Sequence, residues 1–126
     1  MRAEHVITPL APQPIGPYSQ AVQFGNELYC SGQIPLDPET GEIVGGDVTA
    51  QTERVIENIG AVLCAAGYEF VDVVKTTIYL VDMADFPAVN AVYERYFNAN
   101  KPARSTVAVA ALPRGARIEI DCIART

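Results

Sequence analysis

Two charged residues in this chain have the type and setting of groups that do chemistry. Arg104 stands at the start of a predicted strand, where a fixed guanidinium can hold a carboxylate through two parallel hydrogen bonds. Glu119 occupies the middle of another predicted strand, on one face with Arg117 and Asp121. A carboxyl group placed there could act as a general base or orient a water molecule. The alternatives are a solvated arginine, and a structural salt bridge from Glu119 to Arg117 or to a neighbouring strand.

Hydroxyl groups beside glycines form a second set of candidates. Tyr18 follows a Gly-Pro turn, and Ser31 precedes Gly32 at the end of a predicted strand. Such hydroxyls can donate to a bound anion, while a glycine lets a ligand approach the backbone. The alternative is that these residues only satisfy turn geometry.

Several common catalytic systems have no candidate residues here. His5 is the only histidine and lies near the N-terminus, so a Ser-His or Cys-His system has one unpromising base. Cys30, Cys64 and Cys122 are isolated, without a C-x-x-C pair, so we predict no metal site and interpret each cysteine as a buried small hydrophobe. Nucleotide-binding glycine motifs do not occur either, so we predict no nucleotide-binding loop.

Length and charge narrow the class of protein. The chain has 126 residues with 15 acidic and nine basic side chains, for a formal net charge of −6. The length predicts one domain over residues 1–126. The charge disfavours nucleic acid or an anionic membrane as a partner. No apolar run approaches the ~18 residues of a membrane span. The odd number of separated cysteines favours a reducing compartment, so we predict a cytoplasmic location.

Hydrophobic patterning predicts an α+β fold with a six-stranded mixed sheet and two helices. Helical spacing covers 47–66 and 84–98, with Asp47 or Thr49, and Asp82 or Asp85, as candidate caps. Two helices can cover only one face of such a sheet. The other face, with Val107 and Val109 or Ala108 and Ala110, must then meet solvent or another chain, which predicts an oligomer. The predicted strands are 5–8, 20–24, 27–31, 71–81, 104–111 and 116–124.

Taken together, several segments resemble the RidA/YjgF family over nearly the whole chain. They are IGPYSQA at 15–21, SGQIP at 31–35, DPETGE at 37–42, VKTTIYL at 74–80 and KPARS at 101–105, with LP at 112–113 and IEI at 118–120. The resemblance implies a chorismate-mutase-like fold and a homotrimer with sites between subunits. It also implies cofactor-independent hydrolysis of reactive 2-imino acids and their enamine tautomers, such as 2-iminobutanoate and 2-iminopropanoate, to 2-keto acids and ammonia.

The resemblance assigns roles residue by residue. Arg104 matches the carboxylate-binding arginine and Glu119 the glutamate that orients or activates water. Other positions match the pocket lining: Tyr18, which is also a catalytic candidate, Ser31, Gly32, Phe86 and Thr106. Many family members have cysteine where this chain has Thr106, which bears on substrate range.

Other functions are consistent with the same residues. A non-catalytic or regulatory module could hold a 2-keto acid in the arginine pocket without turnover. The ribonuclease or translation-inhibitor activity attached to some family members is disfavoured by the net charge and the lack of a basic stripe. A chaperone-like role is a further suggestion from the family, on which the residues are silent.

Overall fold

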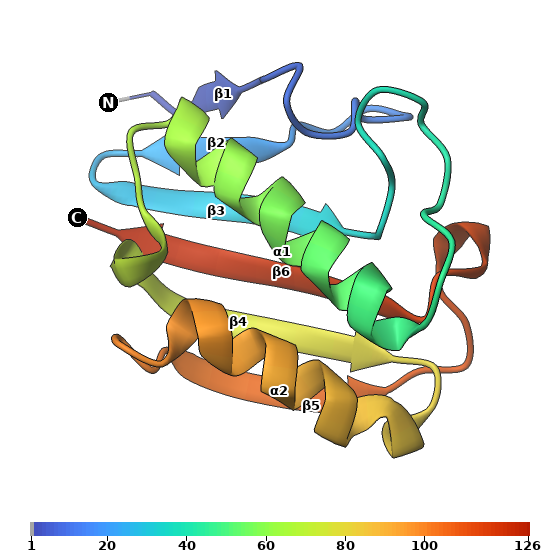
Figure 1. Cartoon of the computed structure of the whole chain (residues 1–126). Helices are drawn as coiled ribbons and strands as arrows, with labels where there is room; N and C mark the ends of the chain where they lie inside the picture. Colours follow the sequence, from blue (N-terminus) through green and yellow to red (C-terminus); the bar gives the residue numbers. More distant parts are fainter. Residues whose placement is uncertain (1) are drawn as a thin grey trace.

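A computed structural model describes residues 2–126 as one six-stranded sheet with two α-helices (Figure 1). The sheet order is β1-β2-β3-β6-β4-β5; β4 and β5 are parallel, and the other neighbours are antiparallel. The mixed α+β architecture predicted from the sequence is therefore confirmed. In chain order the elements are β1 (Glu4–Val6), β2 (Ala21–Phe24), β3 (Glu27–Gln33), α1 (Val48–Ala65), β4 (Val73–Leu80), α2 (Phe86–Phe97), β5 (Ala103–Ala108) and β6 (Ile118–Arg125).

Both helices pack on the same face of the sheet, as Figure 1 shows. The N-cap of α1 is Asp47, whose carboxylate accepts a hydrogen bond from the Ala50 backbone N–H at 3.0 Å. The helix α1 then buries Val55, Ile59 and Val62 at helical spacing against β3 and β6. Asp82 caps the short 3-10 turn before α2, while Asp85 makes no capping bond.

The central strand β6 has two chemically different faces. Ile118, Ile120, Cys122 and Ala124 are buried toward the helices. Glu119, Asp121 and Ile123 alternate with them and point to the opposite face, which no helix covers (Figure 1). The expected open face is thus present, and one of its carboxylates is paired locally: the Tyr79 hydroxyl donates to Asp121 at 3.0 Å. Of the two predicted sets on β5, the register places Val107 opposite Tyr79 on this open face.

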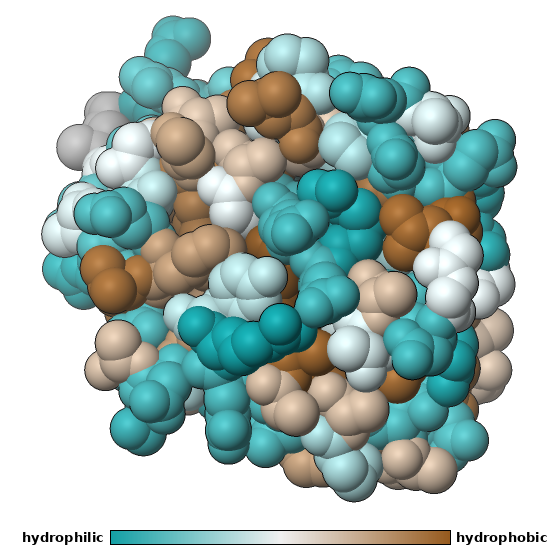
Figure 2. Space-filling view, in the orientation of Figure 1, coloured by the Kyte–Doolittle hydropathy of each residue, from teal (hydrophilic) through white to brown (hydrophobic). Residues whose placement is uncertain are grey.

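The helix-covered side of the molecule shows a mixed surface in which hydrophilic residues separate small hydrophobic areas (Figure 2). None of the helices in the described part of the chain is long and apolar enough to cross a membrane.

Local structure differs from the sequence expectation at several points. The prediction that all three cysteines are buried is wrong for Cys64, which is exposed on α1, whereas Cys30 and Cys122 are buried opposite each other.

The strand boundaries also differ from the prediction. The first strand is Glu4–Val6 instead of 5–8. β4 begins at Val73 because residues 70–72 form a 3-10 turn closed by reciprocal caps between Glu69 and Asp72. β5 ends at Ala108, earlier than expected.

Gln20 fastens the irregular N-terminal arm to the sheet. Its side chain is 1% exposed. Its amide oxygen accepts from the Thr8 backbone N–H at 2.7 Å. Its amide nitrogen donates to the carbonyls of Thr8, Ala11 and Pro12 at 3.1, 3.3 and 2.9 Å. One buried side chain therefore replaces the strand partners that this proline-rich arm lacks.

Replacing Gln20 with leucine should destabilise the protein, because the backbone groups of the arm would lose their partner inside the protein. We expect the free energy of unfolding to fall by about 1–3 kcal/mol, measured by urea denaturation. Gln23→Leu is the matched control: Gln23 lies in β2 with only an exposed hydrogen bond to the Gly25 carbonyl, so its effect should stay within about 0.5 kcal/mol. Equal effects of the two variants would contradict this role for Gln20.

Candidate functional site, divided between two faces of the sheet

The first group of predicted site residues meets where β3 ends. The Ser31 hydroxyl donates to the Ser19 carbonyl at 2.5 Å, and the Ser31 N–H donates to the Gln20 carbonyl at 3.0 Å. Tyr18 and Ser31 line an open hollow of about 550 Å³ beside this end of β3. The Gly-Pro turn before Tyr18 and the antiparallel pairing of β2 with β3 bring the two residues together.

His5 belongs to the same hollow, which sequence reasoning missed. Its Nδ1 lies 2.6 Å from the Ser19 hydroxyl, and its ring lines the hollow with Tyr18 and Ser31. A position near the N-terminus made His5 an unpromising candidate. Its pairing with Val22 across β1 and β2 fixes it instead, and only the non-local strand order reveals this.

Gly32 lies directly beside the carboxylate of Glu119. The pairing of β3 with β6 is irregular between Cys30 and Gln33, which brings the Gly32 backbone against the neighbouring strand. A Cβ atom added at Gly32 would lie 2.2 Å from Glu119 Oε2. A larger residue at position 32 would therefore displace the Glu119 carboxylate, and the structure brings together these two residues, both predicted to line the site.

The environment of Glu119 favours its neutral form. Burial raises the pKa of the Glu119 carboxyl above its usual value, and the negative charge of Asp121 on the same face raises this pKa further. The interpretation of Glu119 as the partner of Arg117 is wrong. Arg117 lies just before β6, and its guanidinium pairs with Asp85 at 2.8 Å. Among residues 2–126 the Glu119 carboxyl has no hydrogen-bond or ion-pair partner, which leaves it available to a ligand or a water molecule.

Arg104 forms the second group, on the helix-covered side of the edge strand β5. Its guanidinium donates to Asn90 Oδ1 at 2.8 Å and its Cζ lies 4.9 and 5.3 Å from the ring centroids of Tyr93 and Phe86. The Tyr93 hydroxyl lies 2.8 Å from that of Thr76, which fixes the ring. Although exposed, Arg104 is therefore held in place by an amide and two aromatic faces.

The two other residues predicted near Arg104 lie in its group. Thr106 follows it on the same side of β5, opposite Ile78. Phe86 opens α2 and packs half-buried against the core while its ring faces Arg104. Asn90 is a further member that the sequence alone did not single out, although it precedes Tyr93 by three residues on the same helix. A hollow of about 280 Å³ lies beside Arg104.

One chain does not bring Arg104 and Glu119 together. Glu119 is on β6 and Arg104 on β5, and β4 lies between these two strands, so the two residues are at least two strand spacings, or ~10 Å, apart. Arg104 also shares the face of the buried Thr76, whereas Glu119 is on the opposite face. The candidate site thus consists of two half-sites, one with Tyr18, Ser31, Gly32 and Glu119, the other with Phe86, Arg104 and Thr106.

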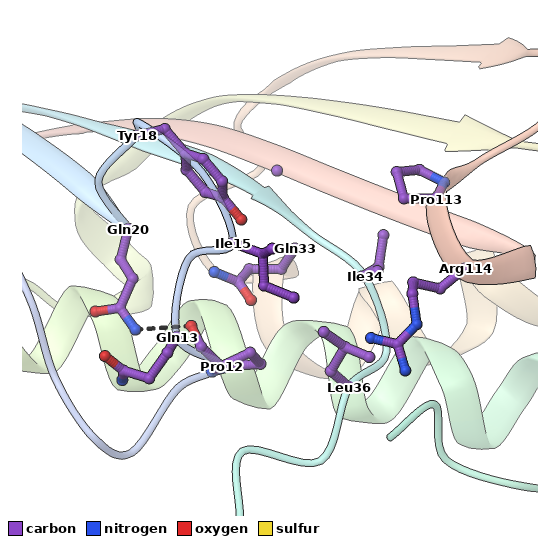
Figure 3. A pocket seen from close by; sticks show the side chains of 11 residues that line it. Pro12, Gln13, Ile15, Tyr18, Gln20, Gln33, Ile34, Leu36, Pro113 and Arg114 are labelled. Carbon is purple, nitrogen blue, oxygen red and sulfur yellow. Dashed lines mark hydrogen bonds between the residues drawn. The ribbon is translucent and has the colours of Figure 1, made fainter. Parts of the chain in front are cut away.

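A deeper pocket of about 350 Å³ adjoins the first half-site (Figure 3). Tyr18 and Gly32 form part of its wall, and Arg114 lies at the other end near Leu36. Within residues 2–126, no cluster of three or more histidine, cysteine, aspartate or glutamate side chains could hold a metal ion.

The fold and the two half-sites together define a small α+β protein with a fixed cation on one face of its sheet and a half-buried carboxyl group on the other. A family model described as endoribonuclease L-PSP matches residues 8–126, and the chain belongs to this family, the RidA/YjgF family it resembles in its motifs.

Relatives of known name support the same assignment. The human 2-iminobutanoate/2-iminopropanoate deaminase is 49% identical over 94% of this chain and 87% of that protein. A RutC family protein of Pyrococcus horikoshii is 56% identical over 96% of both chains. Among solved structures, YyfA of Yersinia pestis, from the conserved Rid protein family, has a TM-score of 0.96 and 47% identity, covering 99% and 100% of the two chains. Escherichia coli TdcF, solved with bound serine, has a TM-score of 0.92 and 40% identity over 98% of both chains.

Removing the charge of Asp121 should lower the pKa of Glu119, because a neighbouring negative charge disfavours ionisation. We expect Asp121→Asn to move the Glu119 titration to lower pH, followed by NMR of its carboxyl carbon. Asparagine keeps an acceptor for Tyr79. The control is Glu57→Gln, which removes one negative charge from α1 on the helix-covered side of the sheet. It should leave the pKa of Glu119 unchanged. The charge effect is refuted when both variants shift the titration equally or neither does.

Proposed function

We propose that the chain hydrolyses 2-imino acids and their enamine tautomers to 2-keto acids and ammonia, as a single-domain cytoplasmic enzyme. The observation that carries this proposal is the fixed guanidinium of Arg104, held by Asn90 and two aromatic rings. A cation fixed before substrate arrives can bind a carboxylate with little loss of side-chain entropy. Relatives at about half identity that are named imine deaminases indicate which carboxylates to test.

The proposed chemistry makes modest demands on the protein. Arg104 binds the substrate carboxylate and so orients the neighbouring imine carbon. A protonated imine carbon is already electrophilic, so a water molecule held by Glu119 can attack it while the carboxylate takes up a proton. The nitrogen of the resulting carbinolamine takes the proton back from Glu119, ammonia leaves as the C–N bond breaks, and loss of the hydroxyl proton leaves the 2-keto acid. Tyr18 stands beside Gly32, where its hydroxyl could polarise the departing nitrogen.

The raised pKa of Glu119 suits a general base. A base is most effective when its pKa approaches the working pH, and burial moves Glu119 in that direction. The ionised form is the active one in this scheme, so the rate should fall as pH drops through the raised pKa.

Division of the site supports assembly between subunits. Arg104 and Glu119 cannot reach one substrate within a single chain, because they lie on opposite faces of the sheet. We propose a homotrimer in which the open sheet faces are covered and the Arg104 half-site of one subunit meets the Glu119 half-site of the next. Exposed Tyr29 and Val107, at 44% and 41%, lie on the open face and supply apolar area for such contacts.

A non-catalytic carboxylate-binding module is the second candidate. It is favoured by the solved structure of TdcF with bound serine, because that protein holds a small carboxylate. The name of the family model points to RNA, but the net charge of −6 disfavours a polyanionic substrate.

Arg104→Ala should abolish imine hydrolysis, because the substrate loses its carboxylate anchor. A loss of about a hundredfold or more is expected for a charge-assisted bidentate contact. Arg104→Lys keeps the charge and should recover only part of the rate. The assay generates imino acids with an amino-acid oxidase and follows 2-keto acid release. Near-wild-type turnover in Arg104→Ala would sink the role of Arg104, and circular dichroism checks that the variant folds.

Glu119→Gln separates the enzyme from the binding module. Glutamine keeps the size and hydrogen bonding of the side chain but cannot accept the proton. We expect turnover to fall by about 10²–10⁴-fold, while calorimetric binding of 2-oxobutanoate stays within about twofold because Arg104 still binds the carboxylate. Absence of turnover in the wild type, with intact keto-acid binding, would favour the module instead.

Mixed oligomers test where the site is formed. In trimers of Arg104→Ala and Glu119→Gln subunits, one interface in each mixed trimer would join an intact Arg104 to an intact Glu119. Co-expression in equal amounts should therefore restore about a quarter of wild-type activity, although each variant alone is inactive. A mixture as inactive as its components would contradict a site shared between subunits. Light scattering gives the mass of the assembly.

A further inference from the structure

The pocket beside the first half-site has features that neither the carboxylate anchor nor the water-activating group uses. Its volume of about 350 Å³ is within the usual range for small-molecule sites. It begins at Tyr18 and Gly32, the two residues that it shares with the half-site. Tyr18 also lines the open hollow beside Ser31, so a ligand in that hollow borders directly on this pocket.

The wall of the pocket is held in a fixed shape. On one side the N-terminal arm is fastened by the Gln20 amide, including its hydrogen bond to the Pro12 carbonyl at 2.9 Å (Figure 3). On the other, the Leu36 N–H donates to the Ile34 carbonyl at 2.7 Å, and the Leu36 carbonyl accepts from Asn58 at 2.9 Å. Aliphatic groups of Ile15, Ile34 and Leu36 form much of the lining, which suits a hydrocarbon stem.

Gln33 is the unusual member of this lining. It is only 7% exposed, and its side-chain amide has no hydrogen-bond partner within residues 2–126, although buried amides are nearly always paired. Its amide atoms are not among the fully enclosed, unpaired groups of the described chain, and Gln33 lines the pocket, so the amide is accessible to a ligand there. An amide in this position offers both a donor and an acceptor to whatever enters.

Arg114 adds a cation at the far end of the same pocket. Its backbone is in the left-handed region at φ +60°, which turns the chain so that the side chain lines the cavity. Its ion pair with Glu42 is long, at 3.7 Å, and both side chains are largely solvent-exposed. Such a pair contributes little, and the guanidinium retains donors for a second acceptor.

From this arrangement we infer that the pocket receives the side chain of the imino acid and favours a short aliphatic stem ending in a planar carboxamide or carboxylate. The inference rests on the proposed function, because Arg104 of the neighbouring subunit and Glu119 are needed to place the substrate at the pocket entrance. The stem would contact Ile15 and Ile34, and the end group would meet the Gln33 amide and the Arg114 guanidinium. Imino acids of the size of those derived from glutamine or glutamate fit this description, whereas a leucine-derived one leaves Gln33 unpaired.

Binding of product keto acids tests the pocket without requiring turnover. The probes are 2-oxoglutaramate, 2-oxoglutarate and 4-methyl-2-oxopentanoate, which carry carboxamide, carboxylate and apolar ends on stems of similar size. Calorimetry on the assembled wild-type protein should show the polar-ended acids binding at least about tenfold more tightly than the apolar one. The carboxamide and carboxylate arms reveal which end group is preferred. Equal affinities for all three acids would overturn the inference.

Two variants locate the preference. Gln33→Leu should reduce the affinity ratio of 2-oxoglutaramate to 4-methyl-2-oxopentanoate by about tenfold or more, because the amide contact is lost and an apolar one gained. Arg114→Ala should selectively weaken 2-oxoglutarate. The matched control is Gln23→Leu, the same chemical change on β2 outside the pocket, which should leave the ratio unaltered. Should Gln33→Leu fail to fold, the surface variant Arg114→Ala still tests the inference: an unaltered affinity ratio of 2-oxoglutarate to 4-methyl-2-oxopentanoate in this variant would overturn the role of the pocket's cation.

The same substrates in the turnover assay separate the two levels of the proposal. A protein that hydrolyses alanine-derived and glutamine-derived imino acids alike, without effect of Gln33→Leu, is an imine deaminase in which the pocket inference has failed. A protein that shows the predicted binding preference but hydrolyses none of them has the pocket, and the proposed function has failed instead.

Discussion

The position of β6 in the sheet is the constraint from which the rest of the site follows. This C-terminal strand is inserted between β3 and β4 and pairs antiparallel with both, so its residues face side chains that are distant in sequence. Because its side chains alternate strictly, burying Ile118 and Ile120 under α1 forces Glu119 onto the open face. The irregular pairing at Gly32 then lets the backbone of β3 approach the Glu119 carboxylate. A shift of the register by one residue would bury a carboxylate in the core and dismantle the half-site.

The second half-site depends on a different layer of the fold. The helix α2 presents Phe86, Asn90 and Tyr93 toward the edge strand β5, where they hold the Arg104 guanidinium. An arginine at an exposed sheet edge ordinarily loses considerable side-chain entropy when it binds a ligand. Here the aromatic packing that forms the core also restrains the cation. The packing of the core and the placement of the cation therefore depend on the same residues, which is why the aromatic face of α2 forms both a part of the core and a pocket wall.

How much the sequence reveals depends on whether an interaction is local. Helix α1, with its Asp47 cap, and the alternation of β6 are set by neighbouring residues, and both are predicted from patterning. The roles assigned to Arg104 and Glu119 came from motif resemblance, and the structure adds the contacts that set their environments.

His5 and Asn90 were missed because their partners, Ser19 and Arg104, are 14 residues away. The burial of Cys64 was mispredicted because an apolar neighbourhood in sequence does not fix which side of a helix faces solvent. The salt bridge from Glu119 to Arg117 was wrong because Asp85, from the turn before α2, competes for the guanidinium.

The division of the site also has a chemical logic. An ionised glutamate and a bound carboxylate repel each other, so a site that holds both must keep them apart until a cation compensates the substrate charge. Within one chain, Arg104 and Glu119 are kept on opposite faces, and neither half-site alone combines an anchor with a base. Bringing two half-sites together would place the cation beside the substrate carboxylate and exclude bulk water, which strengthens the attraction between these two charges. In the proposed trimer, completion of the site and desolvation of Glu119 would be one physical event, because the surface that completes the site would also be the surface that desolvates it.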